Sequence, residues 1–468
     1  MDFRRDSVVD LAARVRSGEL AAREVVTHAL SQIDRLNPML NAFVAVDADA
    51  ALDAAGAIDE RVARGDDVGP LAGIPIGVKD LEDAAGYVTT YGSDLHTADP
   101  PATADSPLVA RLKAAGCVVV GKTNTPEFGF KGVTDNVPFG ATTNPWDTRR
   151  SPGGSSGGSG AAIAGGLVPL ATGSDGGGSI RIPSALCGLS GIKTSQGRVP
   201  LGGPKPPGSG VLSVKGPMTR TTRDAAVALD ACVGHEPTDP YSLPSPAASW
   251  AAALDGDVLP TRVGYSRTMG FATVDPEIGR VVDGAVDALV GAGVEVVDVP
   301  TVFDEDPVMA WFVLWTSARR AAQGHLKGTP AWERIDPELR GQIEYAERLT
   351  AVDHVRALDA VHLLNLRLLA AFDTAGVDVL LTPTVAGQTP VLGHQGTVDH
   401  EEVLTWVSFT PVINVTRNPA GSVCAGVTAA GLPVGIQAIG RPHGDIDVLR
   451  TMAALEDVLA IDRVAPIG

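Results

Sequence analysis

Apolar residues recur along the first 65 positions with the spacing of three to four residues that is typical of amphipathic helices. Ser7, a residue type that caps helix N-termini, stands at the start of the first such pattern. The second pattern is expected to end before Pro38, because proline lacks the N–H that continues a helix. The predicted elements of this segment are helices at 7–17, 25–37 and 47–64 and a short strand at 41–46.

The sequence pattern changes at Leu71, where short runs of β-branched residues begin to alternate with helical patterns. This alternation favours strands that are connected through helices, and it continues to the C-terminus. We therefore predict an α/β fold with a large mixed, mostly parallel β-sheet covered by helices on both faces.

No repeat or charged linker divides the chain, so one domain is expected over residues 1–468. Its expected parts are N-terminal helices at 1–65, a glycine-rich core at 70–220 and a helical cap over the pocket at about 300–375. The later predicted elements are strands at 263–265, 294–299, 377–381, 423–426 and 434–439, and helices at 277–292, 308–372 and 445–459.

Composition and charge limit the classes of function. A chain of 468 residues with 44% hydrophobic content can bury a large core. Its formal net charge of -18 argues against nucleic acid and acidic membranes as partners, because both require an excess of Lys and Arg. The four cysteines have no CxxC spacing, and the N-terminus has no secretory h-region, so we expect reduced thiols and a cytoplasmic protein. A small, roughly neutral substrate fits this charge best.

A glycine-rich segment at residues 153–178 ends directly before Ser179. The segment GGSSGGSG alone also fits a flexible linker. However, it runs into the apolar sequence AAIAGGLVPLATG, which must be packed. Consecutive glycines allow backbone N–H groups to point toward a ligand. We therefore expect Gly176, Gly177, Gly178 and Ser179 to form an oxyanion hole, with Ser179 as a candidate nucleophile.

A serine hydroxyl requires a base near neutral pH. None of the nine histidines lies in a recognisable triad motif, and metal-ligand spacing is absent, so we expect no metal and no cofactor. Lys79 ends the uncharged run LAGIPIGV, where burial would disfavour its ammonium form. To act as a base near pH 7 its pKa must fall by about 3, at a cost of about 4 kcal/mol that desolvation can supply. Asp80 would oppose this by pairing, but adjacent strand side chains point to opposite faces. Considered alone, Lys79 also fits a surface salt bridge.

Several long motifs together resemble those of the amidase-signature enzymes, in the order of that family and over nearly the whole chain. They are LAGIPIGVKD, GKTNTPEFG, NPWDTRRSPGGSSGGSGAAIAGG, GSDGGGSIRIPSALCGLSGIK, FTPVINVTRNPAGS and GLPVGIQAIGRP. The resemblance implies that Ser179 is the nucleophile, that Lys79 is the base and that Ser155, after a cis peptide at Gly154, is the bridging serine. It further implies an acyl-enzyme that water then cleaves.

Four departures from the family pattern leave these three residues untouched. Ser174 replaces a usual threonine, Thr194-Ser195 replaces a Pro-Thr pair, and Cys424 replaces a common proline. Gly176 stands where a bulkier residue is usual, which would loosen the oxyanion loop or widen the pocket. The departures therefore bear on the substrate more than on the reaction.

The pocket wall is expected to include Gly129, Phe130, Trp311, Trp315 and Thr316. Large aromatic residues there favour apolar or aryl amides, although they would also fit a helix core. Esters and aryl carbamates (urethanes) are further expected substrates, because an acyl-enzyme route needs only a carbonyl with an expellable N or O group.

Three alternative functions remain at this point. Gly116 to Thr123 (GCVVVGKT) matches the P-loop pattern for nucleotide binding, but its four intervening residues themselves form a predicted strand. The glutaminase component of a tRNA-dependent amidotransferase, which works with a kinase-like partner, has similar motifs. A binding protein on an inactive amidase scaffold is the third. The favoured interpretation is an enzyme with a small-molecule substrate and no nucleic-acid or membrane partner, either monomeric or homodimeric.

Overall fold

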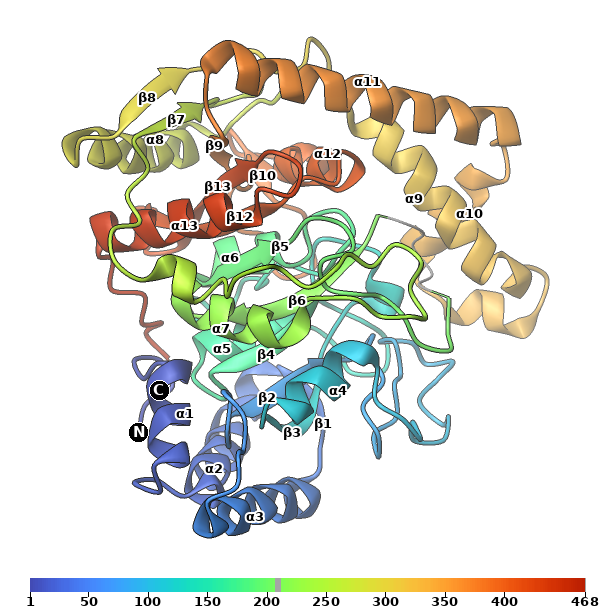
Figure 1. Cartoon of the computed structure of the whole chain (residues 1–468). Coiled ribbons are helices and arrows are strands. Elements are labelled where there is room, and N and C mark those ends of the chain that lie inside the picture. Colours follow the sequence, from blue (N-terminus) through green and yellow to red (C-terminus); the bar gives the residue numbers. More distant parts are fainter. Residues whose placement is uncertain (207–211, 468) are drawn as a thin grey trace.

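The computed structural model describes residues 1–206 and 212–467, so residues 207–211 of the expected core and residue 468 lie outside the described residues. Eleven of the described strands form one sheet in the order β1-β3-β2-β4-β6-β5-β12-β13-β9-β7-β8 (Figure 1). A mixed sheet with flanking helices was expected from the sequence and is confirmed. The strands of this sheet are β1 (Phe43–Val46), β2 (Pro75–Lys79), β3 (Val118–Thr123), β4 (Leu170–Asp175), β5 (Ser190–Lys193), β6 (Val214–Thr219), β7 (Arg262–Tyr265), β8 (Glu295–Asp298), β9 (Val379–Pro383), β12 (Ala420–Val427) and β13 (Pro433–Gly440). A separate small sheet contains β10 (Thr397–Val398) and β11 (Glu401–Glu402).

Strand direction in the sheet differs from the expectation of a mostly parallel arrangement. The pairs β3-β2, β2-β4, β9-β7 and β7-β8 are parallel. The other neighbouring pairs of the described sheet, which include its whole centre from β4 to β9, are antiparallel. The reason is partly visible at β12 and β13, which the short turn 428–432 joins as a hairpin. A short turn can only join antiparallel strands, whereas a parallel pair needs a long crossover.

The helices cover both faces of this sheet. Helices α7, α8 and α13 contact one another or the sheet on one side, and α5 and α6 contact each other and the sheet. Gly435 of β13 faces Ala185 of α6, whereas Gly421 of β12 faces Met452 of α13, which places these two helices on opposite faces. The helices are α1 (Val8–Arg16), α2 (Ala22–Leu40), α3 (Ala48–Arg64), α4 (Pro107–Ala114), α5 (Gly157–Ala164), α6 (Arg181–Cys187), α7 (Thr222–Cys232), α8 (Pro276–Gly291), α9 (Val308–Gln323), α10 (Pro337–Ala346), α11 (Ala351–Ala375), α12 (Phe409–Val415) and α13 (Asp445–Leu459).

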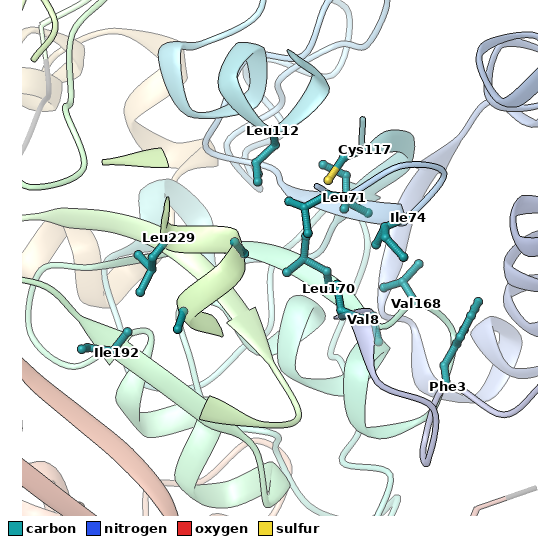
Figure 2. Packing of buried hydrophobic residues seen from close by; sticks show 14 of the residues in the cluster. Phe3, Val8, Leu71, Ile74, Leu112, Cys117, Val168, Leu170, Ile192 and Leu229 are labelled. Atoms are coloured by element: carbon teal, nitrogen blue, oxygen red, sulfur yellow. The ribbon is translucent and has the colours of Figure 1, made fainter. Parts of the chain in front are cut away.

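The largest hydrophobic cluster joins the N-terminal helices, the sheet and α13. Figure 2 shows part of this cluster, in which Leu71, Leu112, Leu170 and Leu229 come from four separate segments of the chain. A second cluster contains the inner side of α9, α10 and α11 together with α12. The two clusters together join the sheet to the helices that surround it.

Two helix boundaries differ from the sequence-based expectation. Helix α2 continues through Pro38 and ends at Leu40, where Asn41 adopts a left-handed conformation with φ 48°. Proline is tolerated here because in the last turn it removes only one helical hydrogen bond, and the left-handed residue then ends the helix. The expected helical stretch 308–372 is divided into α9, α10 and α11. Asp336 caps α10 before Pro337, and Thr350 forms a capping box at the start of α11.

Among the described residues, no helix is both long enough and apolar enough to cross a membrane.

Candidate active site

Lys79 is the last residue of β2, the third strand from one edge of the sheet, and its side chain is 0% exposed. Its Nζ is 2.8 Å from Ser155 Oγ, 2.8 Å from Ser156 Oγ and 2.9 Å from Ser174 Oγ. These contacts are three neutral hydroxyl groups, which do not supply the negative charge that normally stabilises a buried ammonium group. Burial therefore lowers the pKa of Lys79 from 10.5 to about 7, although the charges of Glu82 and Asp175 partly oppose this shift. A lysine with this pKa can act as a base near neutral pH.

Asp80 follows Lys79 directly but is paired with another lysine. Its carboxylate lies 3.1 Å from Lys122 Nζ, and both side chains are buried. Lys122 Nζ also donates to Glu82 O (2.7 Å) and to Thr89 Oγ1 (2.9 Å). The sequence-based argument that Asp80 points away from Lys79 is thus supported by an actual partner on the other side.

The position of Lys122 in the structure excludes the P-loop alternative. Lys122 and Thr123 lie inside β3, and Thr123 Oγ1 shares a 2.7 Å hydrogen bond with Ser159 Oγ. A phosphate-binding loop needs these residues at the start of a helix with their polar groups available. The segment 116–123 therefore has no phosphate-binding geometry.

Ser155 lies in the turn before α5 and is 2% exposed. The Gly154–Ser155 peptide bond is cis, as the family resemblance implied. The next residue, Ser156, also hydrogen-bonds to Lys79, and its Oγ donates to Ser174 O at 3.3 Å. Two adjacent serines thus fix the lysine amino group, although sequence reasoning singled out only the first.

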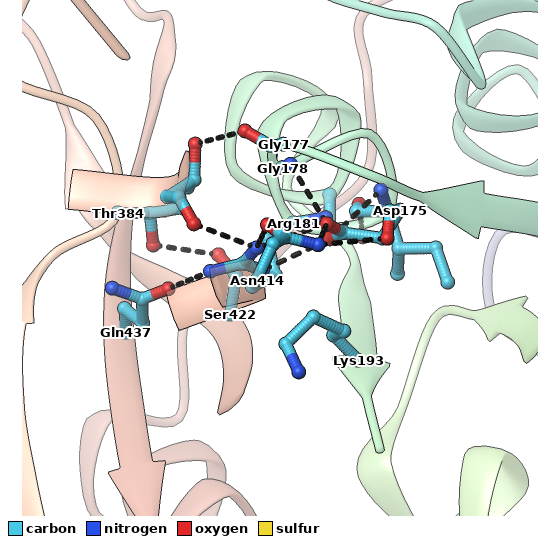
Figure 3. A network of polar contacts seen from close by, with 12 residues as sticks. Asp175, Gly177, Gly178, Arg181, Lys193, Thr384, Asn414, Ser422 and Gln437 are labelled. Atoms are coloured by element: carbon cyan, nitrogen blue, oxygen red, sulfur yellow. Dashed lines mark hydrogen bonds and ion pairs between the residues drawn. The ribbon is translucent and has the colours of Figure 1, made fainter. Parts of the chain in front are cut away.

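The loop Gly176–Ser179 connects β4 to α6 and is held by a buried ion pair at its two ends (Figure 3). Arg181 donates to both carboxylate oxygens of Asp175, from Nε and from Nη2, each at 2.9 Å. Both side chains are 0% exposed. Burial alone would raise the pKa of Asp175, but the Arg181 guanidinium holds that pKa well below its ordinary value. Arg181 also donates to Gln437 Oε1 and to Asn414 Oδ1, both at 2.7 Å.

One expected oxyanion donor has another partner in this structure. The N–H of Gly178 donates to Asp175 Oδ1 at 2.7 Å, so it is not available to a substrate. Gly178 has φ +128°, and a Cβ there would lie 2.2 Å from Thr410 Oγ1, so only glycine fits. The N–H groups of Gly176, Gly177 and Ser179 form no hydrogen bond with any described residue. These three groups remain as candidate oxyanion donors.

Ser179 is partly exposed at the end of this loop. Within the described part of the chain, the Ser179 hydroxyl forms no hydrogen bond, so no hydrogen bond joins Ser155 to Ser179. Catalytic hydrogen bonds are often long in the absence of substrate and shorten when it binds.

Helix α9 packs against the loop Gly176–Ser179 through two tryptophans. The rings of Trp311 and Trp315 are stacked, with centroids 5.3 Å apart and an angle of 17°. A Cβ at Gly177 would lie 2.7 Å from Trp311 Cζ2, and one at Gly176 would lie 2.8 Å from Trp315 Cζ3. Both glycines therefore allow the indole rings to contact the loop backbone directly. This relation explains why Gly176 occupies a position where a bulkier residue is usual in the family.

The other expected wall residues differ in their placement. Gly129 borders Ser155, since a Cβ at Gly129 would lie 3.2 Å from Ser155 Oγ. Phe130 is buried in the hydrophobic cluster that contains Trp315. Thr316 is 0% exposed, and its hydroxyl donates to Phe312 O within α9 at 2.8 Å, so it does not offer a free polar group to a pocket.

No group of three or more His, Cys, Asp or Glu side chains in the described ranges is arranged to hold a metal ion. The four cysteines are free and buried.

The model of the amidase family matches residues 24–449. The chain belongs to the amidase family. This amidase is 37% identical over 465 residues to an acylamidase from Rhodococcus erythropolis, and the alignment covers 97% of the chain and 95% of the relative. It is 36% identical over 466 residues to a glutamyl-tRNA(Gln) amidotransferase subunit from Chloroflexus aggregans, with 94% of each covered. The crystal structure of a bacterial aryl acylamidase of the amidase-signature family is similar with a TM-score of 0.91 and 29% identity, over 99% of each chain.

These relations confirm the family and fold that the motifs implied. The amidase is a hydrolase of carbon–nitrogen bonds, and its substrate is a small-molecule amide.

Asp175 and Arg181 are site residues that sequence reasoning missed. They are the only charged residues in the sequence between Arg150 and Lys193, and they bracket GGGS. Two opposite charges in a long uncharged stretch predict a buried pair, because an isolated buried charge is costly. This signal was sufficient to find them. Asn414 and Thr410 carry no comparable local signal, since only the tertiary structure brings α12 to the loop.

Proposed function

We propose that this amidase hydrolyses small apolar or aryl amides through an acyl-enzyme on Ser179, with Lys79 as the base and Ser155 as the proton relay. The observation that carries the proposal is the buried contact between Lys79 Nζ and Ser155 Oγ at 2.8 Å, together with the lowered pKa of the lysine. A neutral amine hydrogen-bonded to a serine hydroxyl is a competent general base.

The reaction begins with attack of Ser179 Oγ on the carbonyl carbon. As the new C–O bond forms, the Ser179 proton passes to Ser155 and the Ser155 proton passes to Lys79. The negative charge of the tetrahedral intermediate is stabilised by the free N–H groups of Gly176, Gly177 and Ser179. The C–N bond then breaks while Ser155 returns a proton to the leaving nitrogen. Water finally hydrolyses the ester on Ser179, and the same groups remove and return its proton.

The preference for apolar or aryl substrates rests on α9. Trp311, which is partly exposed, contacts the loop that would hold the oxyanion, and the buried Trp315 stacks against it, so a substrate bound at Ser179 would meet the Trp311 ring beside its reacting group. The similarity to an acylamidase and to an aryl acylamidase supports the same preference. Esters and aryl carbamates would react by the same route, because they also carry an expellable group.

The glutaminase component of a tRNA-dependent amidotransferase is the second candidate, and the 36% identity to a glutamyl-tRNA(Gln) amidotransferase subunit favours it. The purified chain alone distinguishes the two functions in assays with p-nitroanilides, phenyl esters, aryl carbamates and glutamine. We expect hydrolysis of the aryl substrates by wild type and none by Ser179→Ala. Glutamine hydrolysis without aryl-amide hydrolysis would favour the amidotransferase function. A wild-type chain that is inactive on every substrate and unlabelled by a fluorophosphonate would indicate an inactive scaffold.

A further inference from the structure

Each of the four peptide units that lead from Asp175 to Ser179 has its carbonyl oxygen hydrogen-bonded. The donors come from three different helices. Asn414 Nδ2 donates to Asp175 O (2.8 Å), Trp311 Nε1 to Gly176 O (2.7 Å), Thr410 Oγ1 to Gly177 O (2.7 Å) and Ile182 N to Gly178 O (2.7 Å). The loop conformation is therefore determined by contacts made to its carbonyl side.

The carbonyl contacts fix the direction of the N–H groups, because a trans peptide places its C=O and N–H on opposite sides. A donor on the carbonyl also polarises the peptide and makes its N–H a stronger donor. The carbonyl of Gly176 and the N–H of Gly177 belong to one peptide unit. The N–H of Gly177 has no partner among the described residues, so it is free to bind an oxyanion.

We propose that Trp311 is a positioning residue of the amidase reaction. Its indole N–H holds and polarises the Gly176–Gly177 peptide, so that the N–H of Gly177 is directed at the oxyanion. The inference rests on the proposed function, and it assigns to the cap helix α9 a role in catalysis in addition to a role in the pocket wall. The ring itself also covers Gly177 closely, which leaves that peptide little freedom to rotate.

The structure offers a matched comparison in Thr410. Its hydroxyl makes an equally short bond to Gly177 O, but the N–H of that peptide belongs to Gly178 and already donates to Asp175. Trp311→Phe and Thr410→Val each remove one side-chain hydrogen bond from the same loop and largely keep its packing. Only Trp311→Phe removes a hydrogen bond from a peptide whose N–H is available to the substrate.

The experiment compares kcat, KM and the inhibition constants of two ligands in wild type and both variants. One ligand is an aryl trifluoromethyl ketone, which forms an oxyanion on Ser179, and the other is an unreactive aryl ketone of similar shape. For Trp311→Phe we expect kcat to fall about tenfold, which is less than the loss of about 10²–10³ seen when a donor is removed outright. Trifluoromethyl ketone binding should weaken by a similar factor, while KM and binding of the unreactive ketone change little.

For Thr410→Val we expect the ratio of the two inhibition constants to remain close to that of wild type. Trp315→Phe is a second control, since it changes an indole to a phenyl ring one turn away and its Nε1 donates to Gln342 Oε1 instead of the loop. It should also keep this ratio. Trp311→His, which retains a ring N–H, should recover part of the loss. Trp311→Leu, which also lacks the N–H, replaces Trp311→Phe as the test if that variant does not fold.

An unchanged ratio in Trp311→Phe, or an equal change of the ratio in Thr410→Val, would overturn the inference while leaving the proposed function intact. A wild-type chain that neither hydrolyses amides nor binds the trifluoromethyl ketone would instead overturn the proposed function. The two failures are therefore distinguishable in one set of measurements.

Discussion

The pH dependence of both activity and stability should report on Lys79. The fold lowers the pKa of this lysine from 10.5 to about 7, mainly through burial. Only the neutral amine can accept the proton of Ser155. We therefore expect kcat/KM to rise with pH to a plateau with an apparent pKa near 7, and to be about one tenth of the plateau value at about pH 6.

The same shift makes folding depend on pH. Above about pH 7 the folded protein has released the Lys79 proton, whereas the unfolded chain keeps it up to about pH 10.5. Stability therefore rises with pH across this window, since the unfolded state binds more protons. Each pH unit is worth about 1.4 kcal/mol per proton, so Lys79 should add about 2 kcal/mol between about pH 7 and pH 9. Below about pH 6 both states hold the proton, and this contribution should be constant.

Lys79→Met isolates this contribution, because every other titrating group is common to both proteins. The measurement is the free energy of unfolding in urea at several pH values, expressed as wild type minus Lys79→Met. The difference should increase by about 2 kcal/mol in favour of wild type from about pH 7 to pH 9. Only the change with pH is interpreted, since removal of the amine also deprives Ser155, Ser156 and Ser174 of a partner.

Lys193 provides a matched control for the activity profile. It is a second fully buried lysine whose pKa is lowered to about 7, by burial first and by the charge of Arg181 second. Its Nζ donates to backbone carbonyls of Thr194 and Asn418 and to none of the candidate catalytic hydroxyls. Lys193→Met should therefore keep a pH–rate profile with a midpoint near 7. A flat wild-type profile down to about pH 5.5, a midpoint near 10, or a midpoint that disappears in Lys193→Met would refute the assignment of Lys79 as the base.

Three other predictions concern the nucleophile and the loop. Ser179→Ala should lower the rate of anilide hydrolysis by about 10⁴-fold or more and abolish fluorophosphonate labelling, and a near-normal rate would exclude Ser179 as the nucleophile. Asp175→Asn should lower the free energy of unfolding by about 3–5 kcal/mol, because it leaves the buried Arg181 without its carboxylate. Asp147→Asn, which breaks a pair with the exposed Arg149, should cost far less in the same urea titration, and equal losses would contradict the argument. Gly176→Ala should cost about 1–3 kcal/mol, since its Cβ would lie 2.8 Å from Trp315, and Trp315→Leu in the same chain should recover part of this loss. Gly284→Ala on α8, where nothing lies within 4 Å of the new Cβ, should instead be neutral or stabilising, and a similar loss there would show that crowding is not the cause.

Helices could be predicted from the sequence where the residues that determine them lie within a few positions of one another. Ser7 caps α1, and the predicted helix 445–459 matches α13, because apolar spacing and capping act within a few residues. The division of 308–372 into three helices also had local signals in Pro337 and Thr350, which the prediction did not use. Sheet direction had such a signal at β12 and β13, where the short turn 428–432 requires an antiparallel pair. For strands far apart in the sequence, direction depends on which of them become neighbours.

The sequence by itself determined the family and the identity of the candidate catalytic residues, because Lys79, Ser155 and Ser179 lie in long motifs that can be read in order along the chain. It also indicated that Lys79 would be buried with a lowered pKa, since an uncharged strand precedes it. Only the tertiary structure decided what surrounds these residues. The partner of Asp80, the use of the Gly178 N–H by Asp175 and the contact of Trp311 with Gly176 O all depend on directional hydrogen bonds or ion pairs. Such bonds require atoms to meet within about 3 Å. The pairing of β2 with β3 brings Lys122 to Asp80, the turn after β4 brings the Gly178 N–H back to Asp175, and the position of α9 beside the loop brings Trp311 to Gly176 O.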